Sequence, residues 1–151
     1  PRVAGFTLIE LLIVVALIAL TSGLVSLALR NPAANQLEVE AARLAALLES
    51  ARAEARASGI AARWVPGRIA DAPVDAPDFR FVGLPSTEPL PTRWLAEGVS
   101  AEIIGVRSLS LGPEPLIGPQ RIVLRLGERN LALATDGLAP FAPVDTPAAN
   151  P

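Results

Sequence analysis

The side chain with the most unusual surroundings in this sequence is the carboxyl group of Glu10. It is the only charged residue in the run from 6 to 29, which is otherwise largely apolar. As an α-helix this run would be roughly 36 Å long, enough to cross a bilayer core of about 30 Å with some tilt. A carboxylate inside hydrocarbon costs on the order of 3 kcal/mol. An acid at such a position therefore indicates a function that depends on its charge.

Two ordinary explanations of the apolar run compete with that hypothesis. A cleaved secretory signal peptide has an apolar core of only about 7–15 residues and a cut site after it. This run is longer, and its best cut site lies before it. In an ordinary signal anchor, Glu10 would sit about 6 Å along the helix axis from Phe6, near the membrane interface, where a charge is tolerated. Periodicity alone leaves the signal anchor open.

The residues around Glu10 narrow the choice. The stretch Gly5–Val15, GFTLIELLIVV, closely resembles the start of type IV pilins and of the pseudopilins of type II secretion systems. In that family a prepilin peptidase cuts after the glycine and methylates the new N-terminal residue. The resemblance implies cleavage between Gly5 and Phe6, an N-methylated Phe6, and Glu10 as the signature acid. The leader, residues 1–5, departs from the family in being short and having a single basic residue.

The two charges that follow the predicted cut are compatible with an assembly role. After cleavage, the amino group of Phe6 is a cation, and a neighbouring subunit displaced along a filament axis can bring its own amino group to Glu10. Such a pair is strongly attractive where the dielectric constant is low, and leaving either charge alone is costly. Glu10 would then set the register of assembly, with no catalytic role.

Few other residues have the types and spacing needed for chemistry. The chain has no cysteine and no histidine, which excludes disulfides and thiol nucleophiles and removes the commonest general base and metal ligand. Asp71, Asp75 and Asp78 could surround a calcium ion, but prolines separate them and the glycine of a calcium loop is missing. A solvated acidic loop is favoured, and we expect no metal, no cofactor and no enzymatic activity.

Arg121, Arg125 and Arg129 could form a basic strip on one strand and the turn after it. The favoured alternative is a solvent-facing strand edge whose charges resist aggregation. A net charge of −2 gives no overall basic field, and nothing basic follows Arg129, so this pattern disfavours a nucleic-acid partner.

The segment 30–58 is predicted to continue the helix beyond a kink at Pro32. Its apolar residues recur at spacings of three and four, which makes one face: Leu37, Ala41, Leu44, Leu48, Ala51 and Ala55. We place Glu40, Arg43, Ser50 and Glu54 away from this face. Gly59 is typical of a helix end. Packing on the chain's own globular domain is favoured over a seam with a partner helix.

Strands are predicted by β-branched or alternating residues between glycine and proline signals. They cover 60–65, 79–82, 99–106 with 108–111 as its continuation, 121–126, and 131–135, the last two forming a hairpin. Prolines make most of 66–92 a loop, and the Pro/Ala-rich residues from 140 on are predicted to be a disordered or extended tail.

These patterns together predict an α+β protein. The expected parts are a leader (1–5), a transmembrane helix (6–29), an amphipathic continuation of the stalk helix (30–58), a β-rich domain (59–139) and a tail (140–151). The pilin-like resemblance implies that the β-rich domain is periplasmic. The pilin-like resemblance implies that the long helix packs on a C-terminal antiparallel β-sandwich.

The segment Ser50–Ile60 also resembles the helix-to-first-strand passage of the H-type minor pseudopilins and their pilus relatives. The resemblance implies a structural subunit that is held in the inner membrane by a single pass before assembly, joins the tip of the periplasmic pseudopilus and supports the export of folded proteins. Its partners would be prepilin peptidase, other minor and major pseudopilins, the inner-membrane assembly platform and membrane lipid. The alternative is a minor pilin of a type IV pilus, related to DNA uptake.

Overall fold

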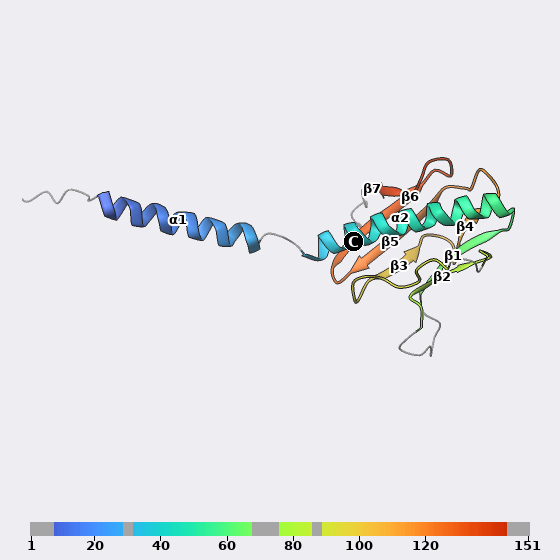
Figure 1. The fold of residues 1–151 in the computed structure, drawn as a ribbon, viewed down its shortest axis with the longest axis horizontal. Helices are drawn as coiled ribbons and strands as arrows, with labels where there is room; N and C mark the ends of the chain where they lie inside the picture. Colours follow the sequence, from blue (N-terminus) through green and yellow to red (C-terminus); the bar gives the residue numbers. More distant parts are fainter. Residues whose placement is uncertain (1–7, 29–31, 68–75, 86–88, 145–151) are drawn as a thin grey trace, which may run out of the picture. The chain divides into compact units, whose positions relative to one another are not determined.

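The structure is a computed structural model that describes residues 8–28, 32–67, 76–85 and 89–144. The chain forms two compact units, Pro1–Pro32 and Ala33–Pro151. The first unit contains helix α1 (Leu8–Ala28). The second unit contains helix α2 (Pro32–Ser58) except for its first residue, Pro32. Its described part also contains seven strands, β1 to β7 (Figure 1).

Helix α2 has the start, face and end that its sequence predicts. It begins at Pro32, and proline is favoured at a first helical position because it has no N–H to leave unpaired. All six residues of the predicted apolar face are buried, which confirms that prediction. At the C-terminal end Gly59 has φ +69°, and its N–H donates to the carbonyl of Ala55 at 3.0 Å. A glycine in this left-handed conformation ends the helix without strain.

Strands β1 (Ala62–Pro66), β2 (Phe79–Val82) and β4 (Leu109–Gly112) form an antiparallel sheet in the order β2-β1-β4. Alternate residues point to opposite faces of a strand. Ala62 and Trp64 of β1 are therefore buried, while Arg63 between them is exposed. The predicted strand over 79–82 is confirmed.

Strands β3 (Ser100–Ile103), β5 (Gln120–Leu126), β6 (Arg129–Thr135) and β7 (Ala142–Val144) form a second antiparallel sheet, in the order β3-β5-β6-β7. The predicted hairpin is confirmed as β5 and β6, which pair from Gln120↔Thr135 to Leu126↔Arg129. Ile122 and Leu124 of β5 are buried, and Arg125 between the buried positions and the turn is exposed.

The segment 99–111 is not one strand with a continuation. Strand β3 ends at Ile103, a turn with Gly105 at φ +84° follows, and β4 joins the other sheet. The pairing partners explain the difference. Leu109 and Leu111 are buried where β4 pairs with β1, whereas β3 pairs with β5.

The globular fold also extends beyond residue 139, where we expected a tail to begin. Phe141 is only 3% exposed, and β7 adds Ala142–Val144 to the edge of the four-stranded sheet by pairing with β6. Burying the aromatic ring of Phe141 favours an ordered segment, and this outweighs the tendency of a proline-rich sequence to form a tail. The remaining tail residues, 145–151, lie outside the described residues, as do 68–75 and 86–88 of the proline-rich loop.

One hydrophobic core joins α2 to both sheets. It contains Leu44 and Leu48 from α2, Trp64 and Leu109 from the three-stranded sheet, and residues such as Ile122, Leu124 and Leu133 from the four-stranded sheet. Figure 1 shows α2 running alongside the strands of both sheets. The observed architecture is therefore α+β, with antiparallel sheets packed against a helix.

Candidate assembly site

The structure describes one of the three residues predicted to carry processing and assembly. Gly5 and Phe6, on either side of the predicted cut, lie outside the described residues. Glu10 lies in the first turn of α1, where its side chain is exposed. A negative charge in the first turn of a helix is favoured by the helix dipole.

The surroundings of Glu10 on α1 are apolar. Leu8 is 78% exposed and Ile9 67%, and the large apolar residues from 11 to 18 are also exposed. They occupy every side of the helix, and a helix that is apolar all round ordinarily has its surface covered by other molecules. Among the described residues, no helix meets the length and hydropathy that crossing a membrane requires.

This arrangement allows Glu10 to bind a cation from another chain. Its carboxylate is the one negative charge on a helix whose other described side chains offer only apolar contact. A cation brought close by another chain would therefore meet a single acceptor, while the surrounding side chains pack and exclude water. Excluding water strengthens the attraction between the two charges.

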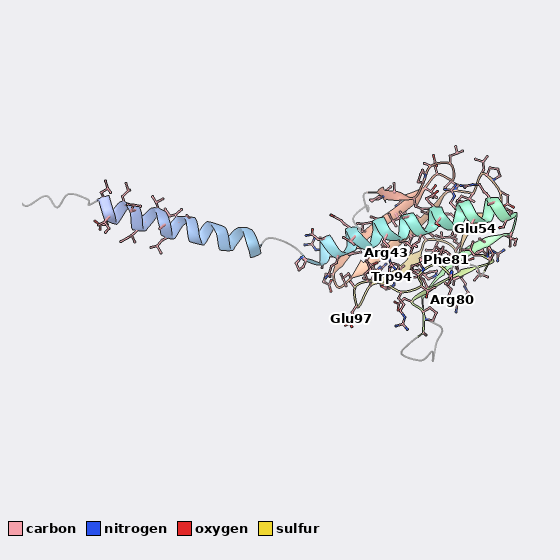
Figure 2. All side chains as sticks on the ribbon, in the orientation of Figure 1. Arg43, Glu54, Arg80, Phe81, Trp94 and Glu97 are labelled. Carbon is pink, nitrogen blue, oxygen red and sulfur yellow. The ribbon has the colours of Figure 1, made fainter. Side chains whose placement is uncertain are left out.

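Two charged clamps on α2 hold loops of the globular unit, and the first centres on Glu40. The Glu40 side chain is 1% exposed, and its Oε1 accepts hydrogen bonds from the N–H groups of Leu95 and Ala96, the second at 2.8 Å. Oε2 has no hydrogen-bond donor but lies 3.6 Å from Nη1 of Arg43. Arg43 in turn donates to the carbonyl of Arg93 at 2.9 Å. Figure 2 shows Arg43 beside this loop, near Trp94.

The second clamp centres on Arg52, whose side chain is 3% exposed. Its guanidinium donates to the carbonyls of Gly137 at 3.1 Å and Ala139 at 3.3 Å, and pairs with Glu49 at 2.9 Å. Oε1 of Glu49 also accepts a 3.4 Å hydrogen bond from the N–H of Phe141. Helix α2 therefore fixes the turn that leads into β7.

The sequence prediction for Glu40 is wrong, and Arg52 was not singled out at all. Helical spacing contained the signal for both. Glu40 is three residues after Leu37 and four before Leu44, so it lies on the buried face, and Arg52 is four residues after Leu48. Each also has an opposite charge three residues away, which allows a charge to be buried with a partner. The prediction put the charged residue Glu40 on the exposed face because it is polar, although its position along the helix places it on the buried face.

The turn at 135–139 has a strong internal network as well. Asp136 Oδ1 accepts hydrogen bonds from the N–H groups of Ala139 at 2.8 Å and Leu138 at 2.9 Å. These two donors, Ala139 first and Leu138 second, hold the pKa of Asp136 below its ordinary value of 3.8, with a smaller contribution from the Arg52 guanidinium. Thr135 donates to the carbonyl of Ala139 at 2.6 Å.

The other candidate site residues are the three aspartates considered for calcium and the three arginines of the hairpin. Of the three acids considered for calcium, Asp71 and Asp75 lie outside the described residues, and Asp78 Oδ2 accepts a 3.0 Å hydrogen bond from the N–H of Trp94. Within the described ranges no group of three or more acidic side chains is placed to hold a metal. Of the three arginines of the hairpin, Arg125 pairs with Glu102 at 3.1 Å.

Comparison with known proteins bears on the N-terminal segment. A family model described as the prokaryotic N-terminal methylation motif matches residues 1–26. This motif indicates a type IV pilin-like protein. Proteins with it are processed by prepilin peptidase, and pilin-like proteins assemble with other pilins. No curated protein and no solved structure matches the chain. The match includes Glu10 and ends before α2, so the pilin-like assignment rests on the N-terminal segment.

Proposed function

We propose that this pilin-like protein is a minor pseudopilin of a type II secretion system, most similar to the H-type. It would be a structural subunit near the tip of the pseudopilus, without enzymatic activity, that supports the export of folded proteins. The observation that carries the proposal is the methylation motif over residues 1–26, with Glu10 in the first turn of an apolar helix.

The proposed topology follows from the hydropathy of the N-terminal segment and from its resemblance to pilins. Prepilin peptidase would cut between Gly5 and Phe6 and methylate Phe6. Residues 6–29 would then hold the subunit in the inner membrane by a single pass, with the globular unit in the periplasm. The length of the apolar sequence supports this placement, since about 20 apolar residues span a bilayer core.

The proposed assembly step joins two charges from different subunits. The Phe6 amino group of one subunit would meet the Glu10 carboxylate of its neighbour, surrounded by apolar helices. Leaving either charge unpaired in that setting costs several kcal/mol, so the pair would favour one axial displacement of the subunits over others. Other minor and major pseudopilins and the inner-membrane assembly platform would be the partners.

The globular unit supports a mechanical role in this proposal. A subunit that transmits force needs its loops held to the helix that joins it to the filament. The Glu40 and Arg52 clamps meet this need, because each binds backbone groups of a distant loop to α2. In the proposed subunit, the two sheets would form a β-sandwich of the pilin-like type against that helix.

The decisive experiment combines processing with secretion. On co-expression with a prepilin peptidase, intact-mass analysis should find a chain that begins at methylated Phe6, and Gly5→Leu should block the cut because a side chain would obstruct the backbone there. Deleting the gene in its native host should trap exoproteins in the periplasm. A processed protein whose loss leaves secretion intact would refute the pseudopilin assignment and leave the pilin-like one standing.

One observation favours the alternative of a DNA-uptake pilin. Arg63 on β1 and Arg80 on β2 share the outer face of the three-stranded sheet, where the register Arg63↔Val82 and Val65↔Arg80 makes them diagonal neighbours. Diagonal neighbours lie about 7–8 Å apart. DNA binding that weakens with salt and with Arg63→Ala would support this alternative. Unchanged uptake of DNA by a deletion strain would contradict it.

A further inference from the structure

A groove lies where β5 begins and β6 ends, next to β4. It has a volume of about 620 Å³, and its walls come from the start of β5, the end of β6, β4 and the chain between β3 and β4. Ile104 and Val106 form an apolar wall and are 53% and 55% exposed. Arg121 and Pro119 line the groove from β5 and the residues before it.

Arg121 is the charged side chain of this groove, and it differs from its neighbour on the same strand. Arg125, on the same face, is paired with Glu102 at 3.1 Å. Arg121 has no hydrogen bond or ion pair from its side chain among the residues that the structure describes. The residues beside it across the sheet are Ala134, by strand register, and Ile104, whose N–H donates to the carbonyl of Arg121. Neither can neutralise a guanidinium, and Glu102, which the strand register makes a diagonal neighbour of Arg121, pairs with Arg125 instead.

A segment with the opposite chemistry precedes the groove in the chain. Residues 113–116 carry the carboxylate of Glu114 and the side chain of Leu116, which is 63% exposed. Glu114 is also exposed, and within the described ranges it makes no ion pair. Pro113 and Pro115 restrict the backbone, so little conformational entropy remains to be lost when the segment binds.

The base of this segment is firmly held. Ile117, directly after Leu116, is 6% exposed, and its carbonyl packs so closely on Gly137 that a Cβ there would lie 1.6 Å from the oxygen. The segment is therefore presented to solvent from a fixed base. Within one chain the structure leaves Glu114 and Arg121 unpaired, although only a short loop separates them in sequence.

We propose that the groove binds residues 113–116 of a second copy of this chain. Glu114 of one copy pairs with Arg121 of the other, and Leu116 packs against Ile104 and Val106. The segment and the groove are adjoining parts of one surface, since Gly118 and Pro119 line the groove. Two copies can therefore exchange segments reciprocally, as a two-fold interface requires. This contact goes beyond the proposed function and does not depend on it.

Disulfide trapping in the full-length protein tests the contact directly. The natural chain has no cysteine, so any disulfide joins introduced residues. Ile104→Cys and Leu116→Cys are made in separate chains that carry tags of different mass, then mixed in detergent and oxidised. The expected product is a 104–116 disulfide between two chains, identified by intact mass and peptide mapping.

Matched positions control for random collision. Val82 and Leu95 are similarly exposed, at 51% and 65%, and lie outside the groove. The mixture of Val82→Cys with Leu95→Cys should give at least about fivefold less cross-linked product, the factor that corresponds to roughly 1 kcal/mol. Equal yields from the two mixtures would overturn the proposal.

Charge reversal tests the ion pair separately. Arg121→Glu or Glu114→Arg, each placed in both tagged chains, should reduce the 104–116 disulfide about fivefold, because like charges then face each other. Combining both reversals should restore it. Arg125→Glu, a control on the same strand, should change the yield less than twofold. Failure of the double reversal to restore cross-linking would refute the assigned pairing.

Discussion

Replacing Glu40 tests whether a buried carboxylate holds the loop 92–98 on helix α2. In Glu40→Ala, the N–H groups of Leu95 and Ala96 lose their shared acceptor, and Arg43 loses its ion-pair partner but keeps its hydrogen bond to the carbonyl of Arg93. A buried donor left without an acceptor costs about 1–3 kcal/mol. Leu95 is exposed, so water can reach part of this loop, and each lost hydrogen bond should cost about 1 kcal/mol, at the lower end of the range.

The remaining terms are smaller and partly cancel. The pair with Arg43 is 3.6 Å long, and the Arg43 side chain is 24% exposed, so its loss should cost less than about 1 kcal/mol. Removing a carboxylate whose Oε2 has no hydrogen-bond donor relieves some desolvation. We therefore expect Glu40→Ala to lower the free energy of unfolding by about 2–3 kcal/mol. Glu40→Gln keeps an acceptor oxygen and should cost about 1 kcal/mol.

Urea unfolding of the fragment 33–151, followed by tryptophan fluorescence, measures this loss. The fragment corresponds to one compact unit, and Trp94 lies in the affected loop with its ring 4.7 Å from that of Phe79. Glu38→Ala, on the exposed side of α2, is the control and should change stability by less than about 0.5 kcal/mol. If Glu40→Ala unfolds at the same urea concentration as Glu38→Ala, the clamp contributes nothing and the reasoning fails.

Three further predictions concern other parts of the chain. Gly137→Ala places a Cβ against the carbonyl of Ile117 and should lower the free energy of unfolding in urea by at least about 3 kcal/mol. Gly127→Ala is the control: Gly127 has φ +56° and open space around it, so the loss should be about 1–2 kcal/mol. Equal losses in the two variants would contradict the close approach of Gly137 to Ile117. The lowered pKa of Asp136 contributes stability that is present above its ordinary value of 3.8 and is lost as the pH falls through the folded-state pKa. An NMR titration of its carboxyl carbon with a midpoint at or above 3.8 would refute this. Glu10→Gln should leave peptidase processing near normal but weaken cross-linking to other pilin-like subunits in membranes, and unchanged cross-linking would exclude the charge pair.

Features that depend on local spacing and on turn residues were predictable from the sequence. The buried face of α2, its end at Gly59 and the β5–β6 hairpin depend on local spacing and turn residues, and each is present in the structure. The strand over Phe79–Val82 was also predictable, because apolar and polar residues alternate between turn signals. Local chemistry sets these features, so distant residues are not needed to identify them.

Features that depend on distant partners were not predictable in the same way. Whether Leu109–Gly112 continues β3 or pairs with β1 depends on which apolar surface lies closer in space. The composition of residues 140–144 is that of a tail, yet Phe141 is buried and β7 pairs with β6 because the folded sheet provides an edge for them.

The same division applies to the candidate sites. Gly5, Phe6 and Glu10 were predicted from the sequence alone as a processing and assembly motif, because one glycine, one aromatic residue and one acid at fixed spacing form a chemically specific string. The methylation-motif match over residues 1–26 includes all three positions, and their individual roles stay a prediction. The burial of Glu40 and Arg52 was visible only in the folded structure, because a charge can be buried there only when hydrogen bonds to backbone groups far away in the chain compensate for the loss of water. It also decided that Arg125 is paired while Arg121 lines a groove, because the partner of a surface charge depends on which strand lies beside it.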